Sequence, residues 1–496
     1  MAVDYNLVIL GGSLVAHNAA LRAVAWGARV ALVEPPRSSV DWEREQLQLA
    51  YLQASWNATD SPAQSPMHRS SRDATLQERL AQANAFANWQ LEQSSPAYLG
   101  AKGIDVVLGK GAFVNRPALG VLVGHRLLRG HHYLIAGAAE PHAPESLQSV
   151  SIASLQQLLP AQSVGVWGDH PQGIVLAQAL RRLGLPVVLA TPAPRLLPDE
   201  APAAVALLQA QLEAEGVRVV TSATLKTEPL ASSWNTGLRK AGASEATALG
   251  EEGLATGDRA SERPKATDRV IIQSGSLVLG VDSVISPGVY RPALSTLNLP
   301  STISTTPRGI EVNSRLQTAH PCIYACGYTI NAACSENKAI AEAQVAVDNA
   351  LSLPYRRIAY SKIPRVLMAD PPLIQIGLTL QQAQQVSKGA VASQTALPPK
   401  RQAQLDGKPL GLYQTVLSRR GRILGGCAVG PDAQSWAEAL GWAIAQRTKI
   451  QSLADWPNTA CGEAMSTLAE QWRRRRRGWR VDGRELLLSW RRDWTR

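Results

Sequence analysis

A glycine-rich turn near the N-terminus is the first group of residues whose spacing suggests chemistry. Gly11, Gly12 and Ser13 follow an apolar run, and Ala16 begins the next one. Glycine at a strand-to-helix turn lets the backbone approach a ligand closely, and the first N–H groups of the helix attract a pyrophosphate. Glu34 stands 23 residues after Gly11, where a carboxylate can bind ribose hydroxyls. The pattern predicts either a nucleotide site or a purely structural β-turn-α-β unit.

A second glycine turn, at residues 168–173, is less suited to binding a nucleotide. His170 stands at the position of closest backbone approach, where an imidazole would collide with a dinucleotide. Asp169 adds negative charge beside the expected pyrophosphate, and Thr191 stands where a ribose-binding acid is usual. We therefore expect this second unit to be structural, with NAD(P)H binding as the less favoured alternative.

The cysteines offer little for catalysis. All five lie in the C-terminal part of the chain: Cys322, Cys326, Cys334, Cys427 and Cys461. They are too few and too clustered for a disulfide framework, which favours a reducing compartment. Cys322 and Cys326 would point the same way on a strand, so they are either a redox dithiol or, more commonly, two structural thiols. No zinc-ligand spacing of Cys and His occurs, and no metal site is predicted.

These residues must be positioned by a chain that reads as alternating strands and helices. A β-turn-α-β unit at residues 5–34 and another at 163–190 form an internal repeat of a nucleotide-binding fold. Residues 231–268 are rich in Ala, Gly, Ser, Thr and charge, which predicts a disordered surface insertion. From Arg365 the composition changes to that of an α+β module.

Taken in order, five blocks of the sequence resemble the flavin-dependent pyridine nucleotide-disulfide oxidoreductases, the class that contains mercuric reductase and dihydrolipoamide dehydrogenase. The blocks are LVILGG…VALVE, RLGLPVVLATPAPRLLPDEAPAAVALLQAQLEAEGV, HPCIYACG, RVLMADPPLIQIGLTLQQA and GRILGGCAVGPDAQSWAEALGWAI. The likeness covers about residues 4–468, and the shared order and spacing make it specific. It implies a homodimer with NAD(P)H as a second nucleotide. It also implies FAD bound through Gly11, Gly12, Ser13, Ala16, Glu34 and Gly327.

The resemblance implies an α/β protein with two Rossmann-like domains, of FAD- and NAD(P)-binding type, and a C-terminal α+β dimerisation domain. The expected FAD-binding-type domain has two parts, residues 1–150 and 291–355. The NAD(P)-binding-type domain, 151–290, is inserted between them. The dimerisation domain covers 356–471, and a basic tail covers 472–496.

The chain also departs from this family at positions that matter for catalysis. Relatives carry a redox-active cysteine pair after the second strand, whereas residues 35–53 contain no cysteine. Asn458 stands at the position of the catalytic His, and Tyr328 replaces an Asp beside the flavin. Thiol–disulfide exchange requires a thiolate, and an amide cannot transfer protons at neutral pH. We therefore assign no catalytic residue and predict that disulfide and Hg(II) reduction are lost.

The basic charge is concentrated at the C-terminus. Residues 472–496 hold ten Arg against three acidic residues, a net +7 of the chain's +11. Leu486, Trp490 and Trp494 can share one helical face. The tail is either a solvated terminus or a segment, Arg473–Arg496, that binds an acidic protein or an anionic membrane surface; nucleic acid is less favoured. The chain has no apolar run of about 18 residues and no signal-peptide pattern, so we expect a cytoplasmic protein, peripheral at most.

Two functions from different classes follow from this pattern. The first is a divergent flavoprotein oxidoreductase that transfers electrons without a cysteine pair. The second is a pseudoenzyme, a dimeric scaffold that uses its basic tail to bind a partner. The resemblance favours the first, while the substitutions at His170, Tyr328 and Asn458 favour the second.

Overall fold

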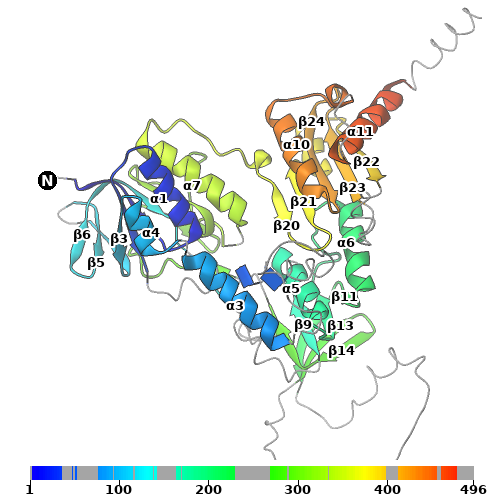
Figure 1. Cartoon of the computed structure of the whole chain (residues 1–496), viewed down its shortest axis with the longest axis horizontal. Coiled ribbons are helices and arrows are strands. Elements are labelled where there is room, and N and C mark those ends of the chain that lie inside the picture. Colours follow the sequence, from blue (N-terminus) through cyan, green and yellow to red (C-terminus); the bar gives the residue numbers. More distant parts are fainter. Residues whose placement is uncertain are drawn as a thin grey trace, which may run out of the picture.

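The computed structural model describes most of the chain and leaves several of the predictions outside it. The described residues are 3–35, 47–48, 51–52, 76–92, 94–115, 118–137, 139–141, 163–168, 170–228, 269–286, 290–332, 334–397, 411–454 and 460–477. The predicted insertion at 231–268, most of the cysteine-free segment 35–53, Asp169, Asn458 and residues 478–496 lie outside these ranges. The described part forms three units, each built on its own main sheet (Figure 1).

The first unit is a five-stranded parallel sheet. Its order is β19 (Ile323–Ala325), β7 (Gly130–Ile135), β1 (Tyr5–Leu10), β2 (Val30–Glu34) and β3 (Ile104–Leu108). The strands are nearly continuous runs of Val, Ile and Leu because both faces of the sheet are covered. Helices α1 (Leu14–Ala25) and α7 (Glu336–Leu351) cover one face. The antiparallel strands β4 (Gly111–Val114), β5 (Gly120–Val123) and β6 (Arg126–Leu128) cover the other.

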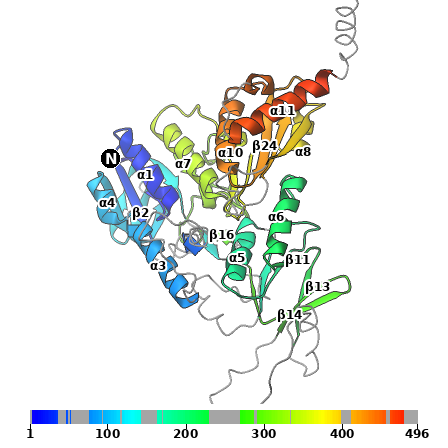
Figure 2. The ribbon, with the colours of Figure 1, turned by 45° about the vertical axis from the view of Figure 1, so that its right-hand side comes forward.

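The chain leaves the first unit and returns to it. The outgoing strand β8 (Ala139–Pro141) pairs antiparallel with the returning strand β16 (Tyr290–Pro292). The hairpin of β17 (Thr305–Thr306) and β18 (Gly309–Ile310) follows, and β19 then joins the first sheet beside β7. Helices α3 (Leu76–Glu92) and α4 (Pro96–Ala101) lie between β2 and β3 in the chain, and α3 extends from the first unit toward the second (Figures 1 and 2).

The second unit repeats the parallel arrangement with fewer strands. Its order is β11 (Arg218–Val220), β10 (Val187–Ala190), β9 (Val164–Trp167) and β15 (Ser283–Ile285). Helices α5 (Pro171–Arg182) and α6 (Pro202–Ala214) share a core with one face of the sheet. The antiparallel strands β12 (Thr224–Glu228), β13 (Arg269–Ser274) and β14 (Leu277–Val281) pack on the other.

The third unit is an antiparallel sheet with helices. Its order is β20 (Arg365–Leu367), β21 (Leu373–Gly377), β24 (Ile423–Val429), β23 (Gly411–Leu417) and β22 (Val391–Leu397). Helices α10 (Ala433–Ala445) and α11 (Ala460–Arg477) bury Trp436 and Leu468 against the sheet. Helix α8 (Leu380–Val386) contacts β22 and β24. The predicted boundary at residue 472 falls inside α11, because Trp472 is buried in this core and the helix continues to Arg477.

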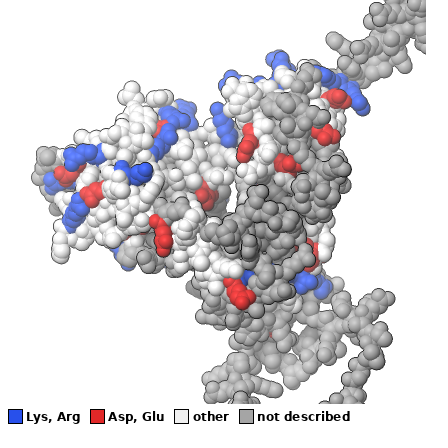
Figure 3. All heavy atoms as spheres, viewed as in Figure 1, with Lys and Arg blue, Asp and Glu red and all other residues white. Residues whose placement is uncertain are grey.

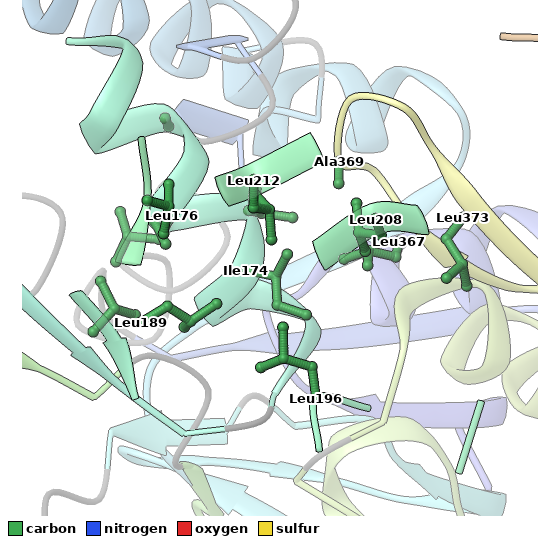
Figure 4. Close-up of a cluster of buried hydrophobic side chains, with 14 of the residues drawn as sticks. Ile174, Leu176, Leu189, Leu196, Leu208, Leu212, Leu367, Ala369 and Leu373 are labelled. Atoms are coloured by element: carbon green, nitrogen blue, oxygen red, sulfur yellow. The ribbon is translucent and has the colours of Figure 1, made fainter. Parts of the chain in front are cut away.

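The second and third units share one core. Leu208 and Leu212 of α6 pack with Leu367 and Leu373, which flank the loop between β20 and β21 (Figure 4). At the edge of this core Arg182 pairs with Glu215 at 2.7 Å and with Asp370 of that loop at 3.0 Å. The third unit is therefore held directly on the second unit. Among the described helices, none has the length and apolar content needed to cross a membrane.

Candidate nucleotide site

The turn between β1 and α1 forms where the sequence predicts, and packing explains its two glycines. Gly11 has a φ of 150°, and a Cβ there would lie 2.1 Å from the carbonyl oxygen of Ala136. A Cβ on Gly12 would lie 2.8 Å from Cγ of Glu34. Because β1 pairs in parallel with both β2 and β7, the carboxyl ends of the three strands meet here. Only glycine lets them approach this closely.

Ser13 and Ala16 complete the turn from the inside. The Ser13 hydroxyl accepts a hydrogen bond from the N–H of Ala16 at 3.3 Å and donates one to the carbonyl oxygen of Ala136 at 3.2 Å. Ser13 is therefore the N-cap of α1 and satisfies one free N–H of its first turn. Its side chain is buried, so a serine in place of glycine takes no room on the outer side of the turn. Ala16 is buried between the helix and the sheet.

A buried acid–histidine pair lies beside this turn, and the sequence analysis identified only the acid. Glu34 ends β2, and its Oε1 lies 3.9 Å from Nε2 of His17 on α1. His17 is 6% exposed, and neither of its ring nitrogens has a hydrogen-bond partner among the described residues; nor does Oε2 of Glu34. The sequence signal for His17 is a polar residue on the otherwise alanine-rich buried stripe of α1.

Burial sets the protonation of this pair. Removal from water disfavours the charged form of a group, so it lowers the pKa of His17 to about 4 and raises the pKa of Glu34. At neutral pH the imidazole is therefore uncharged, with one N–H donor and one acceptor nitrogen. Three buried polar atoms without partners thus lie together at the predicted nucleotide turn.

The strand that returns from the second unit brings Gly327 to the same end of the sheet. Gly327 opens the short 3-10 helix η5 (Gly327–Thr329) with a φ of 64°, and a Cβ there would lie 3.6 Å from Cγ1 of Val15 on α1. Its N–H donates to Oε2 of Glu342 at 2.7 Å. Tyr328 is buried in the core between α1 and α7. This corner therefore rests on a carboxylate of α7, with an aromatic ring behind it.

Glu342 is a buried carboxylate behind Gly327, with two more exposed side chains as its partners. The Tyr360 hydroxyl donates to its Oε1 at 2.9 Å, and Nζ of Lys338 lies 3.8 Å from the same oxygen. Burial raises the pKa of Glu342, whereas these partners and the Gly327 N–H favour its charged form. These contacts hold η5 in place at the end of β19. Tyr360 belongs to the short helix η6 (Tyr360–Lys362).

The described cysteines are free thiols in structural positions. Cys322, Cys326, Cys334 and Cys427 form no disulfide with one another. Cys326 is fully buried at the end of β19, and its burial together with Glu342 raises its thiol pKa well above the usual range. A thiolate is therefore disfavoured at Cys326, which favours structural thiols over a substitute dithiol with Cys322. Within the described ranges no group of three or more Cys, His, Asp and Glu is placed to hold a metal.

The second glycine turn is occupied by its own side chains. His170 is the N-cap of α5, and its Nδ1 accepts a hydrogen bond from the N–H of Gln172 at 3.4 Å. Pro171 begins the helix and has no N–H to offer. Thr191 is fully buried, and its hydroxyl accepts from the N–H of Ala193 at 3.1 Å. Of the backbone N–H groups that would bind a pyrophosphate at this helix end, that of Gln172 is already bonded to His170, and Pro171 has none.

Comparison with known proteins gives two family matches. Residues 5–233 match the family "Pyridine nucleotide-disulphide oxidoreductase". Residues 363–459 match the dimerisation domain of the same family. The two matches correspond to the nucleotide-fold units and to the antiparallel module with α10.

Similar proteins with curated descriptions come from the same group. A mercuric reductase from Staphylococcus aureus is 23% identical over 469 residues, which is 91% of this chain and 79% of that protein. A dihydrolipoyl dehydrogenase from Bacillus subtilis is 25% identical over 374 residues, 72% of each chain. A mercuric reductase from Streptomyces lividans is 27% identical over 390 residues, 74% of each chain.

Solved structures share the fold at lower identity. LpdA from Mycobacterium tuberculosis superimposes with a TM-score of 0.74 at 17% identity, covering 94% of this chain and 99% of its own. The HOCl-induced flavoprotein disulfide reductase RclA from Escherichia coli gives 0.68 at 17% identity, covering 93% and 99%. The predicted fold class, two Rossmann-like domains with a dimerisation domain, is confirmed.

Proposed function

Because the chain belongs to the pyridine nucleotide-disulphide oxidoreductase family, we propose that it is a flavoprotein oxidoreductase that moves electrons at FAD without the cysteine pair of its relatives. The observation that carries the proposal is the β1–α1 turn. Its two glycines stand where a side chain would collide with Ala136 or Glu34, and beside them the buried polar atoms of His17 and Glu34 lack partners among the described residues. A nucleotide with free hydroxyls supplies the missing partners.

The residues of this chain fit the adenosine half of FAD. The N–H groups at the start of α1 would hold the pyrophosphate next to Gly11 and Gly12, with Ser13 and Ala16 shaping the helix start. Glu34 would bind the ribose, and Gly327 borders the same end of the sheet. When bound, FAD supplies the electron acceptor and donor. The protein orients it and excludes water.

The same family membership supports a homodimer through the third unit. The source of electrons is a separate part of the proposal. His170 and Pro171 leave few donors at the start of α5, so we propose that NAD(P)H binds weakly at the second unit. Electron delivery then depends on a small acceptor or donor that reaches the flavin directly.

The test is the colour and the activity of the purified protein. We expect a yellow homodimer with near-stoichiometric FAD and no NADPH-dependent reduction of disulfides or Hg(II), because residues 35–53, directly after β2, contain no cysteine. Absorbance near 450 nm measures the flavin, on the order of one per chain. Robust turnover of either substrate would contradict the loss of dithiol chemistry. A colourless dimer would contradict the flavoprotein proposal.

A second candidate function, binding of an acidic protein or anionic membrane surface, is favoured by a basic face on the third unit. This face is the set Lys388, Arg419, Arg420, Arg422, Arg447, Lys449, Arg473 and Arg474, on three turns and the end of α11. The backbones of Arg422 and Lys449 pair in an isolated antiparallel β-bridge, and Trp472 packs on Gly421. The turns that carry these basic residues and the end of α11 therefore lie side by side. Among the described residues only Arg474 of this set has an acidic partner, Glu470 at 3.6 Å. Figure 3 shows Lys and Arg side chains along the upper margin of the third unit, with acidic side chains among them.

A further inference from the structure

We propose that His17 is a second ribose-binding side chain, which together with Glu34 recognises both hydroxyls of the adenosine ribose. The inference rests on the proposed nucleotide site and assigns a further residue to it. His17 lies one helical turn after Ser13, and it faces the end of β2 across the glycine turn. The pair is thus formed by two residues that adjoin the turn from different elements.

The distance between the two side chains suits a shared hydrogen-bonding ligand better than a direct bond. The 3.9 Å between Nε2 of His17 and Oε1 of Glu34 is too long for a direct hydrogen bond. An oxygen placed between them can lie within hydrogen-bond distance of both atoms. Both ring nitrogens and Oε2 of Glu34 are buried without partners in the described part of the chain. A buried polar atom left unpaired costs about 1–3 kcal/mol, so a ligand that pairs them is stabilised.

The chemistry of the pair matches a vicinal diol. A carboxylate only accepts hydrogen bonds, whereas a neutral imidazole both donates and accepts. One ribose hydroxyl can donate to Glu34 while the other donates to the acceptor nitrogen of His17. A ribose phosphate would instead bring negative charge against the Glu34 carboxylate. The site should therefore take an adenine nucleotide with both ribose hydroxyls free.

The experiment measures nucleotide affinity by calorimetry on the full chain freed of flavin, with ADP, 2′-deoxy-ADP and 3′-deoxy-ADP as probes. For the unmodified chain we expect each deoxy analogue to bind about tenfold more weakly than ADP, the effect of one hydrogen bond. His17→Phe keeps a planar ring without nitrogens. It should weaken ADP about tenfold and lose the discrimination against one deoxy analogue.

Two further variants separate hydrogen bonding from packing. His17→Gln keeps a donor and an acceptor and should regain part of the ADP affinity. It also replaces His17→Phe if that variant does not fold. His132→Phe, at a partly buried histidine near the start of β7, should leave all three affinities unchanged.

The outcomes are distinct. Equal ADP affinity in His17→Phe and the unmodified chain, with both deoxy analogues still discriminated, would assign the ribose to Glu34 alone and overturn the proposal for His17. If the unmodified chain binds neither ADP nor FAD, the nucleotide site itself fails, and the role of His17 fails with it.

Discussion

At the residue scale, the nucleotide turn depends on the smallest side chains in the unit. Gly11 and Gly12 are needed because the ends of β2 and β7 pack directly against the turn. Ser13 uses its hydroxyl to cap α1 and to bind the carbonyl of Ala136. Each of these contacts makes the turn closely packed and fixes where α1 begins.

Replacing Gly11 tests whether packing or conformation sets this requirement. Gly11→Ala would place a Cβ 2.1 Å from a carbonyl oxygen. We therefore expect the free energy of unfolding to fall by about 3 kcal/mol or more, and the flavin sites to be empty. Gly27→Ala is the matched control, because Gly27 also has a positive φ but nothing lies within 4 Å of its Cβ. It should cost about 1 kcal/mol. Thermal unfolding and flavin absorbance measure both, and equal losses would disprove the packing argument.

Burial of His17 predicts acid sensitivity of the flavin-free protein. The unfolded chain protonates this histidine near pH 6.5, whereas the folded protein resists until about pH 4. The stability that the folded protein gains from keeping His17 uncharged is therefore fully present above pH 6.5 and is lost as the pH falls toward 4. His17→Phe should not show this loss. Over the whole pH range the free energy of unfolding of the unmodified protein should therefore fall by about 3 kcal/mol more than that of the variant. Glu34, whose pKa is raised, acts in the opposite direction in both proteins.

Melting temperatures at pH 7 and pH 5 measure this effect. The decrease between the two should be smaller in His17→Phe than in the unmodified protein, while His125→Phe, at an exposed histidine, should match the unmodified protein. The same decrease in all three proteins would show that His17 is not the acid-sensitive group.

At the element scale, the two β-turn-α-β units differ in how each helix begins. Helix α1 begins with a buried serine, whereas α5 begins with His170, which accepts from the N–H of Gln172, and with Pro171, which has no N–H. A proline in the first turn removes one of the N–H donors that an anion binds at a helix end.

Removing the imidazole tests whether α5 is blocked. His170→Gly should cost only a few tenths of a kcal/mol as a cap and should strengthen NADPH binding, measured by nicotinamide fluorescence. Thr379→Gly removes the capping box of α8, a comparable loss away from any nucleotide turn, and should leave NADPH binding unchanged. Unchanged binding in His170→Gly would show that the histidine is not the obstacle.

At the scale of the whole molecule, the third unit is attached to the second and exposes its charge. The shared core and the pairs of Arg182 with Glu215 and Asp370 hold the two together. The basic face lies on turns and on α11, away from that core. Because Trp472 is buried against Gly421, removal of the chain from residue 472 would damage the fold, so the tail is best removed after Arg477.

The basic face predicts salt-sensitive binding to anionic vesicles. Removal of residues 478–496 should weaken binding, and Arg419→Glu with Arg420→Glu should weaken it further, because each step removes cationic charge. Each cation near the surface contributes about 1 kcal/mol. Sedimentation with vesicles at low and high salt measures this binding. Arg308→Glu, at an exposed arginine outside the basic face, is the control and should bind as the unmodified chain does. If all variants bind as the unmodified chain does, the basic face is not a membrane site, and an acidic protein remains as the partner to test.

Much of the fold could be predicted from the sequence because it depends on local patterns. The predicted β-turn-α-β unit at residues 5–34 is β1, α1 and β2, and the one at 163–190 is β9, α5 and β10. Apolar runs and glycine turns set such elements by period and by backbone freedom. The partners of Gly11 and Gly327 could not be predicted, because Ala136 and Glu342 reach them only through strand pairing and helix packing.

The sequence by itself determined the family, the order of the two nucleotide-fold units and the absence of cysteine at residues 35–53. Only the tertiary structure decided that His17 faces Glu34 and that Cys326 is fully buried. The physical reason is distance along the chain. Periodicity specifies which face of an element is apolar, but which side chains from separate elements meet depends on how the elements pack. The chemistry of the candidate site depends on those meetings.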